Sequence, residues 1–279
     1  MVKAKNILIT GSNGQLGLSL RRASKYFKEN NYFFTSHQQL SINNFDKIND
    51  YIVENKIHSI INCAAYTNVK GAEKNKKLAD LVNNISVDNL AKICSEKKLQ
   101  LIHISTDYVF DGMTNVKYLE TDIPNPINYY GLTKLNGEKK VLSYNLINSV
   151  IIRSSWIYSL HSNSFLKKIL NKLDKQEFIN VIDNEIGSPT CSDDLAKFIL
   201  KIIPIIKSKT TQIYNFSNDG SCSRYEFAFY ILKLLNFDTK RLKPSKDIDK
   251  LVLRPRFTVL NCNKIKKHFD YSLTDWKLS

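Results

Sequence analysis

A glycine-rich turn directly after an N-terminal apolar run constrains the fold of this chain most strongly. Residues 6–10 form the apolar run, and residues 18–26 have the character of a helix. Between them, Gly11, Gly14 and Gly17 are spaced three residues apart. Glycines at such a turn let the backbone approach a pyrophosphate, and the helix N-terminus then offers unpaired N–H groups and a positive dipole end. The segment therefore predicts a strand, turn and helix that bind a dinucleotide.

Strand-like and helix-like segments alternate after this unit. Expected strands cover residues 32–35, 59–65, 99–105, 150–153, 178–182 and 212–216. Expected helices cover residues 45–55, 76–97, 130–143, 164–173, 192–203 and 223–235. Such alternation predicts an α/β fold, with a doubly wound parallel sheet of the Rossmann type that carries helices on both faces.

The expected domain organisation is interleaved. With 279 residues the chain can bury a large core without disulfides or metals. We expect residues 1–155 and 191–218 to form a dinucleotide-binding domain. A smaller substrate-binding domain toward the C-terminus is expected from residues 156–190 and 219–279.

The charge of the chain bears on its partners. The 41 Lys and Arg residues against 26 Asp and Glu residues give a formal net charge of +15. The basic residues are spread along the chain and include no arginine-rich cluster, so we expect no nucleic-acid partner. A general positive potential would instead attract a polyanionic nucleotide substrate.

Other features of the composition bear on the compartment. No run of about 18 apolar residues is present, so we expect no membrane span. The five cysteines form no C-x-x-C pair, which predicts a reducing environment with neither disulfides nor a zinc site. The first expected strand begins at residue 6, which leaves no room for a signal peptide. We therefore expect a cytoplasmic protein.

Tyr130 and Lys134 are four residues apart in an expected helix, and positions i and i+4 share a helix face. A lysine held there can stabilise a phenolate and lower the tyrosine pKa from its usual value of about 10. Such a tyrosine can pass a proton to a carbonyl oxygen near neutral pH. In a chain with 14 tyrosines, a solvated lysine beside a half-buried tyrosine is the alternative. The glycine-rich turn upstream favours the catalytic interpretation.

Polar segments also follow three other expected strands, at residues 62–66, 105–109 and 153–158. The carboxyl ends of parallel strands meet at the ligand crevice of such a sheet. There, Thr106 can hydrogen-bond a substrate carbonyl while Tyr130 protonates it. The spacing leaves Ser105 as an alternative, and Thr106 could instead cap a turn. Thr106, Tyr130 and Lys134 together are a set for carbonyl reduction, in which a nicotinamide cofactor supplies the hydride.

The residues after the second expected strand bear on the choice of cofactor. Proteins that use NAD usually place a carboxylate there to bind the ribose 2′-OH, and no carboxylate follows before Asp46. Thr35, Ser36 and His37 can accommodate a 2′-phosphate, although no arginine is present to bind it. We expect NADPH, with NADH as the alternative.

On these motifs, the chain resembles the extended short-chain dehydrogenases and, within them, the dTDP-4-dehydrorhamnose reductase family. The blocks general to the wider group are residues 10–17 and 130–138. The blocks typical of the reductases are S-T-D-Y-V-F-D-G at residues 105–112, R-S-S-W-I-Y at residues 153–158 and G-S-P-T at residues 187–190. Further matches at residues 61–69, 163–165, 183–186 and 254–261 extend the resemblance nearly end to end.

The resemblance implies reduction of the 4-keto group of a nucleotide-linked 6-deoxysugar, most directly dTDP-4-dehydro-L-rhamnose to dTDP-L-rhamnose for surface polysaccharide. It implies that Thr106, Tyr130 and Lys134 are catalytic. Cofactor contacts are implied for Tyr130 and Lys134 and for Gly11, Asn13, Gly14, Gln15, Leu16, Ala64, Ala65 and Tyr66. The positions that match sugar-facing residues are Asp107, Tyr108 and Trp156. Arg254 is expected either at the nucleotide side of the substrate or in a structural ion pair.

Departures from the family pattern keep alternatives open. Lys70 stands where the family usually has Asp, which leaves a CDP- or GDP-linked ketosugar as an alternative substrate. Ser41 replaces a common Asp near the adenine. Some members form a dimer bridged by magnesium through two glutamates; Ser19 replaces the first, and the chain ends soon after Trp276, before the helix that carries the second. We therefore expect no metal, and either a monomer or a homodimer.

Two further alternatives differ in chemistry. A fucose-synthase-like enzyme would also epimerise the sugar, using an added acid and base such as Cys and His. Neither Cys191 nor His161 has a sequence context that supports such a role. A catalytically silent nucleotide-binding subunit is the non-enzymatic alternative, since a fold does not fix a function. The complete set of Thr106, Tyr130 and Lys134 argues against it.

Overall fold

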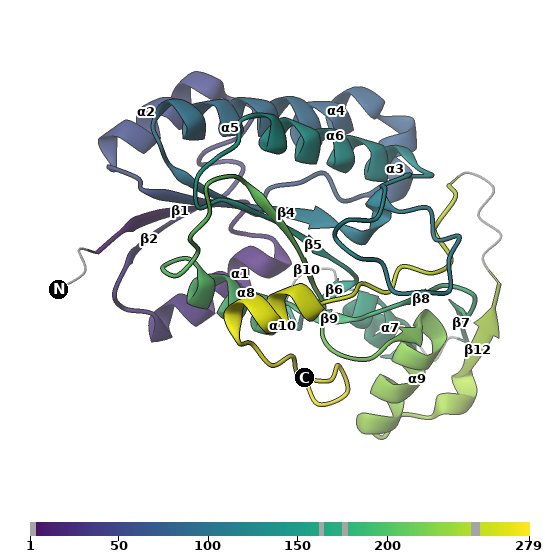
Figure 1. Cartoon of the computed structure of the whole chain (residues 1–279). Coiled ribbons are helices and arrows are strands. Elements are labelled where there is room, and N and C mark those ends of the chain that lie inside the picture. Colours follow the sequence, from purple (N-terminus) through teal and green to yellow (C-terminus); the bar gives the residue numbers. More distant parts are fainter. Residues whose placement is uncertain (1–3, 162–164, 175–177, 247–251) are drawn as a thin grey trace.

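The computed structural model describes residues 4–161, 165–174, 178–246 and 252–279 (Figure 1). Its centre is a six-stranded sheet in the order β2-β1-β3-β4-β5-β10, in which every neighbouring pair is parallel. The strands are β1 (Asn6–Thr10), β2 (Asn31–Thr35), β3 (Ser59–Asn62), β4 (Gln100–Thr106), β5 (Val150–Ser154) and β10 (Gln212–Phe216). The expected parallel sheet of an α/β fold is thus confirmed. From β1 the chain adds β2 on one side and β3 on the other, and ligands bind at such a switch point.

Helices cover both faces of the sheet (Figure 1). One face carries α2 (Phe45–Glu54), α5 (Ser86–Glu96) and α6 (Tyr129–Ser143). The opposite face carries α1 (Gln15–Ala23), α8 (Ser192–Ile202) and α10 (Asn263–Phe269). Sequence patterns indicated α1, α2, α6 and α8 to within a few residues and α5 as the second half of a longer helix, whereas α10 was missed because seven residues carry too little periodicity.

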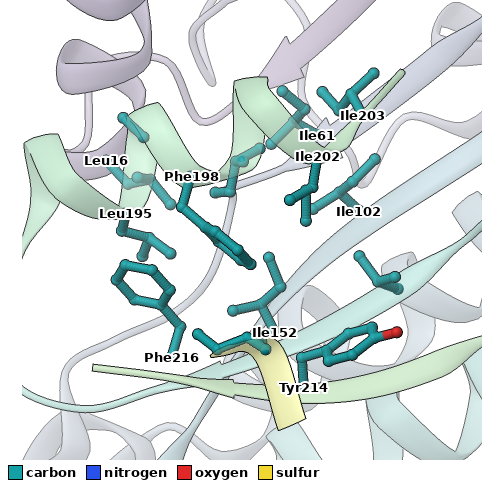
Figure 2. Packing of buried hydrophobic residues seen from close by; sticks show 14 of the residues in the cluster. Leu16, Ile61, Ile102, Ile152, Leu195, Phe198, Ile202, Ile203, Tyr214 and Phe216 are labelled. Carbon is teal, nitrogen blue, oxygen red and sulfur yellow. The ribbon is translucent and has the colours of Figure 1, made fainter. Parts of the chain in front are cut away.

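The core consists of two apolar layers, one on each face of the sheet. Phe198 and Leu195 of α8 pack with Ile152 and Phe216 in one layer, and Figure 2 shows Phe198 reaching toward these strands. The other layer joins residues of α2, α5 and α6 to the opposite side of the same strands. Burial on both faces explains why β3, β4 and β5 are nearly continuous apolar runs rather than alternating ones.

The segment expected as one helix at residues 76–97 contains an irregular turn. It divides into α4 (Lys76–Asp80), a π-helical turn at Leu81–Ile85, and α5. The turn places Asn83 in the interior, where its amide binds the backbone N–H and C=O of Tyr66 at 2.8 and 3.0 Å and the Thr133 hydroxyl at 3.1 Å. Such turns are rare and occur often at functional sites. Here the turn ties the loop after β3 to helix α6.

A smaller group of elements lies beside one end of the sheet (Figure 1). Strand β7 (Ile179–Ile182), which was expected from sequence, pairs with β12 (Leu242–Ser245) outside the central sheet and packs with α7 (Phe165–Asp174) and α9 (Arg224–Leu234). Two-residue pairings link β6 (Ile157–Tyr158) with β9 (Thr190–Cys191), and β8 (Ile186–Gly187) with β11 (Cys222–Ser223). A separate apolar cluster joins β7, β12, α7 and α9, whereas α10, which comes from the segment expected in the substrate-binding domain, packs on β10 of the central sheet.

Short elements complete the chain. They are α3 (Val69–Lys74) and three 3-10 turns at Ser24–Tyr26, Asp107–Val109 and Thr239–Arg241. Within the described ranges, none of the helices combines the length and the apolar character needed to cross a membrane. The five cysteines all lie within these ranges, and all are free thiols.

Candidate functional site

A cavity of about 970 Å³ runs along the carboxyl ends of the sheet strands. It brings together the three expected catalytic residues, Thr106, Tyr130 and Lys134. All the expected cofactor residues line it as well: Gly11, Asn13, Gly14, Gln15, Leu16, Ala64, Ala65 and Tyr66. Asp107 and Trp156 join them from the expected sugar-facing set, whereas the lining includes neither Tyr108 nor Arg254.

The glycine-rich turn is shaped for close approach. Gly11 has φ +64°, and a Cβ there would lie 2.7 Å from the backbone nitrogen of Ala64. Only glycine fits both the left-handed conformation and this space. Helix α1 begins at Gln15, and its N-cap Gly14 provides no side-chain hydrogen bond. The first N–H groups of α1 are therefore available to an anionic ligand in the cavity.

Helix α6 positions the tyrosine. Its N-cap residue Asn128 accepts a hydrogen bond from the Gly131 N–H at 2.8 Å, which fixes the start of the helix. A Cβ on Gly131 would lie 2.1 Å from the Tyr108 carbonyl oxygen, so glycine lets α6 approach the turn that follows β4. As a result Tyr130 lies beside Thr106, whose hydroxyl hydrogen-bonds its phenol. The rings of Tyr130 and Tyr108 meet edge-on at 5.8 Å.

The geometry separates Thr106 from its neighbour Ser105. The Ser105 hydroxyl donates to Glu138 Oε1 at 2.5 Å and is thus occupied. The Thr106 hydroxyl donates to Asp107 Oδ1 at 3.1 Å. Of the two candidates left open by the sequence, Thr106 is the one placed beside Tyr130.

Lys134 is oriented differently from the sequence expectation. Its Nζ donates to the Ile104 carbonyl at 2.7 Å and lies 3.3 Å from His103 Nε2. Burial lowers the pKa of Lys134 to about 8. We expected Lys134 to lower the pKa of Tyr130, but burial raises the pKa of Tyr130, and the interaction with the Thr106 hydroxyl only partly offsets this. The expectation was wrong in direction because enclosing protein disfavours the phenolate more than its neighbours stabilise it.

A buried ion pair supports this site from behind. Arg153 at the end of β5 binds Glu138 of α6 through Nη2 at 2.7 Å and through Nε at 3.0 Å, and the two side chains are only 3% and 1% exposed. Ser105 donates to the same carboxylate. The pair was missed in the sequence, although Arg153 ends an expected buried strand and Glu138 follows Lys134 by one helical turn.

The residues expected to face the sugar include Asp107 and Trp156. Burial raises the pKa of Asp107 to about 6, and its Oδ2 has no hydrogen-bond partner among the described residues. Trp156 has φ +44°, an uncommon conformation for a bulky residue. Arg224 stacks on its ring at 4.0 Å and donates to Glu185 at 2.7 Å. Sequence reasoning missed Arg224 and Glu185, because they join the site only through tertiary contacts.

Two expected residues lie just outside the cavity lining. Tyr108 is buried, and this burial raises its pKa. The positive charges of Arg224 and Arg254 act in the opposite direction and lower the pKa of Tyr108, which indicates that Arg254 lies near this side chain. Cys191 and His161, considered for epimerisation, are likewise absent from the lining described for the cavity.

The sequence indicated only some of the cavity residues that follow β2. His37 and Gln38 line it directly after β2, with Leu40, Ile42 and Asn43 next in the chain. No carboxylate lies among these lining residues, as expected from the sequence. In the part of the chain that the structure describes, no group of three or more His, Cys, Asp or Glu side chains is placed to hold a metal.

Known proteins resemble this chain over nearly its whole length. The family model described as the RmlD substrate binding domain matches residues 5–279. A dTDP-4-dehydrorhamnose reductase of Aggregatibacter actinomycetemcomitans is 34% identical, covering 97% of this chain and 95% of the relative. A dTDP-4-keto-6-deoxy-D-glucose reductase of Streptomyces niveus is 33% identical over 91% of this chain and 87% of its own length.

A solved structure agrees with these sequence matches. The dTDP-4-dehydrorhamnose reductase of Bacillus anthracis, crystallised in complex with NADP, superposes with a TM-score of 0.92 at 33% identity. The match covers 99% of this chain and 96% of that one. Fold, cavity and sequence matches agree, and the chain belongs to the RmlD substrate binding domain family.

Proposed function

We propose that this chain reduces the 4-keto group of a nucleotide-linked 6-deoxysugar with NADPH, converting dTDP-4-dehydro-L-rhamnose to dTDP-L-rhamnose. The observation that carries the proposal is the single cavity in which Thr106, Tyr130 and Lys134 lie beside the glycine-rich turn. The names of the relatives supply the substrate class. The NADP bound to the Bacillus anthracis reductase supports the choice of cofactor.

The cavity residues fit a dinucleotide. Gly11 leaves no room for a side chain, and the uncapped start of α1 offers N–H groups to a pyrophosphate. Ala64, Ala65 and Tyr66 line the same wall, and Asn83 fixes the Tyr66 backbone through two hydrogen bonds. When bound, the nicotinamide would supply the hydride.

The chain's own residues supply the proton and orient the oxygen. Thr106 would donate a hydrogen bond to the ketone oxygen, and Tyr130 would deliver its proton to the same oxygen. The raised pKa of Tyr130 keeps that proton on the phenol at neutral pH, which suits an acid in the reductive direction. Lys134 in its charged form would stabilise the phenolate that remains. Asp107 Oδ2, which lacks a protein partner among the described residues, would accept from a sugar hydroxyl.

We expect kcat/KM for reduction to fall as the pH rises through about 8, because Lys134 then loses its charge.

The free energy of unfolding should instead rise with pH over the same range. The pKa of Lys134 is about 8 when folded and 10.5 ordinarily, so the unfolded chain binds more protons between these values. The free energy of unfolding contributed by this group therefore rises with pH across that window. A pH profile of kcat/KM, measured beside unfolding curves, checks both signs; a rate that stays constant from neutral pH to pH 10.5 would contradict the role of Lys134.

His37→Asp should shift the cofactor preference from NADPH toward NADH. An added carboxylate at this end of the cavity would repel a 2′-phosphate and could bind a free ribose hydroxyl. We expect KM for NADPH to rise roughly tenfold, as for one unfavourable charge contact of about 1.4 kcal/mol. His37→Asn is the uncharged control and should change the preference little. If the ratio of KM for NADPH to KM for NADH is the same in both variants and in the wild type, the 2′-phosphate binds elsewhere.

The direct test of the proposed function is turnover with dTDP-4-dehydro-L-rhamnose. Loss of NADPH absorbance should accompany formation of dTDP-L-rhamnose, identified by NMR. Parallel assays with CDP- and GDP-linked 4-keto sugars test the alternative substrates. NADPH binding without turnover of any of these sugars would contradict the proposal and favour a silent nucleotide-binding subunit.

A further inference from the structure

A chain of buried polar groups ends at Lys134. The Thr10 hydroxyl donates to Asn62 Oδ1 at 2.7 Å, Asn62 Nδ2 lies 3.1 Å from His103 Nδ1, and His103 Nε2 lies 3.3 Å from Lys134 Nζ. His103 is fully buried in β4 and is not among the residues that line the cavity. The reduction outlined above gives it no role.

The spacing of residues along helix α6 matches that along strand β4 where the two elements pack together. Residues i and i+4 of a helix are about 6 Å apart along its axis, and residues i and i+2 of a strand are about 6.6 Å apart. Lys134 therefore meets His103 while Glu138 meets Ser105. The first contact joins two nitrogens, whereas the second joins a hydroxyl to a carboxylate.

Backbone geometry fixes the orientation of the Asn62 amide. The Ala64 N–H, which can only donate, lies 3.2 Å from Asn62 Oδ1. The amide nitrogen of Asn62 must therefore face His103 and donate to Nδ1. A neutral imidazole that accepts at Nδ1 carries its proton on Nε2. That N–H is aimed at Lys134 Nζ.

Two donors meet whenever Lys134 is charged. An ammonium has no lone pair, so it cannot accept from His103 Nε2–H, whereas a neutral amine can. In the other imidazole tautomer the proton is on Nδ1, so that Nδ1–H and the Asn62 Nδ2–H are the two donors that face each other. Burial and the charge of Lys134 both lower the pKa of His103 well below its usual range, so a doubly protonated ring is excluded. Protonation of Lys134 thus costs one buried hydrogen bond in either tautomer.

We propose that His103 is a positioning residue for the reduction, which holds the Lys134 amine and opposes its protonation through the Thr10–Asn62–His103 chain. The other charged or titratable groups that act on Lys134 are Glu138 from α6 and Cys63 from the segment after β3, and Tyr130 lines the same cavity. Glu138 and Cys63 favour the charged lysine, and Arg153 binds Glu138 from behind. His103 counteracts them, so that Lys134 can exchange a proton near neutral pH. The consequence for the rate rests on the proposed function; the effect on Lys134 itself does not.

The test follows the ionisation of Lys134 by NMR in the whole chain, using lysine labelled with a stable isotope at Cε. The Lys134 signal is identified by its absence from Lys134→Met. His103→Gln offers an amide oxygen to the ammonium, and His103→Asn keeps an acceptor for Asn62 while removing the competing N–H. We expect the Lys134 titration midpoint to rise by about one pH unit in His103→Gln and by less in His103→Asn. The descending limb of kcat/KM should move by the same amount.

Gln100→Met is the matched control, because it removes a buried amide of the same strand that bonds Ser59 and the Asn148 carbonyl but does not contact Lys134. It should leave the midpoint unchanged. An unchanged midpoint in whichever His103 variant folds, or an equal shift in Gln100→Met, would overturn the proposal. If the wild type turns over no ketosugar, the NMR midpoints still decide the effect of His103, and only the proposed function fails.

Discussion

Tyr130→Phe is expected to lower kcat for ketosugar reduction by roughly 10³-fold, within the range that a positioned general acid contributes. The substitution removes the only atom of this side chain that can deliver a proton. The aromatic ring remains packed edge-on against Tyr108 at 5.8 Å, so α6 should keep its place. Because the glycine-rich turn and the loop after β3 are untouched, NADPH affinity should stay close to that of the wild type.

The measurement combines steady-state kinetics with a cofactor titration by fluorescence. Tyr129→Phe is the matched control: it is the same change one residue earlier, in a side chain that contacts Lys76 rather than the cavity. It should remain near wild-type activity. A Tyr130→Phe enzyme that reduces the ketosugar at the wild-type rate would show that the proton comes from another group. A joint loss of NADPH binding would instead indicate that the phenol holds the cofactor.

Arg153→Met is expected to reduce the free energy of unfolding by about 3–5 kcal/mol, which is the usual cost of removing one partner from a buried ion pair. Glu138 is 1% exposed and would lose both guanidinium contacts while its charge stays buried. Among the described residues, only Ser105 would then remain as a hydrogen-bond donor to that carboxylate. Activity at low temperature should fall too, because α6 carries Tyr130 and Lys134 as well as Glu138.

Chemical denaturation measures the change, and two comparisons isolate its cause. Lys140 lies on α6 like Glu138, and Lys140→Met breaks its ion pair with Asp88 of α5. The two side chains are 47% and 33% exposed, so the change should cost less than about 1 kcal/mol. The double variant with Arg153→Met and Glu138→Leu removes both charges and should recover much of the loss. An Arg153→Met protein as stable as Lys140→Met would mean that Glu138 finds another partner or becomes protonated.

Features encoded by local sequence were predicted well. The Gly11 turn, the strands of the central sheet and the Tyr130–Lys134 helix depend on residues close together in the chain, and they lie where the patterns indicated. The cavity could be predicted because parallel strands bring their carboxyl ends together whatever their order. This rule placed residues 105–109 and 153–158 at the crevice without knowledge of the intervening loops, whereas the choice of Thr106 over Ser105 and the role expected for Trp156 came from the family resemblance.

Features that depend on distant residues could not be predicted in this way. The partner of Lys134 is the β4 carbonyl of Ile104 rather than the phenol of Tyr130, and only the packing of helix on sheet decides this. Arg224 reaches Trp156 from α9, across nearly seventy positions of sequence. The direction of the Tyr130 pKa shift followed from enclosure, which residue spacing does not report.

The π-helical turn at Leu81–Ile85 has a consequence for comparing this chain with its relatives. A turn of this kind holds one residue more than the regular helix that would cover the same length. Asn83 reaches both Tyr66 and Thr133 because of that extra residue. A relative that lacks one residue at this point of an alignment is therefore expected to lack the hydrogen bonds by which Asn83 joins the loop after β3 to helix α6.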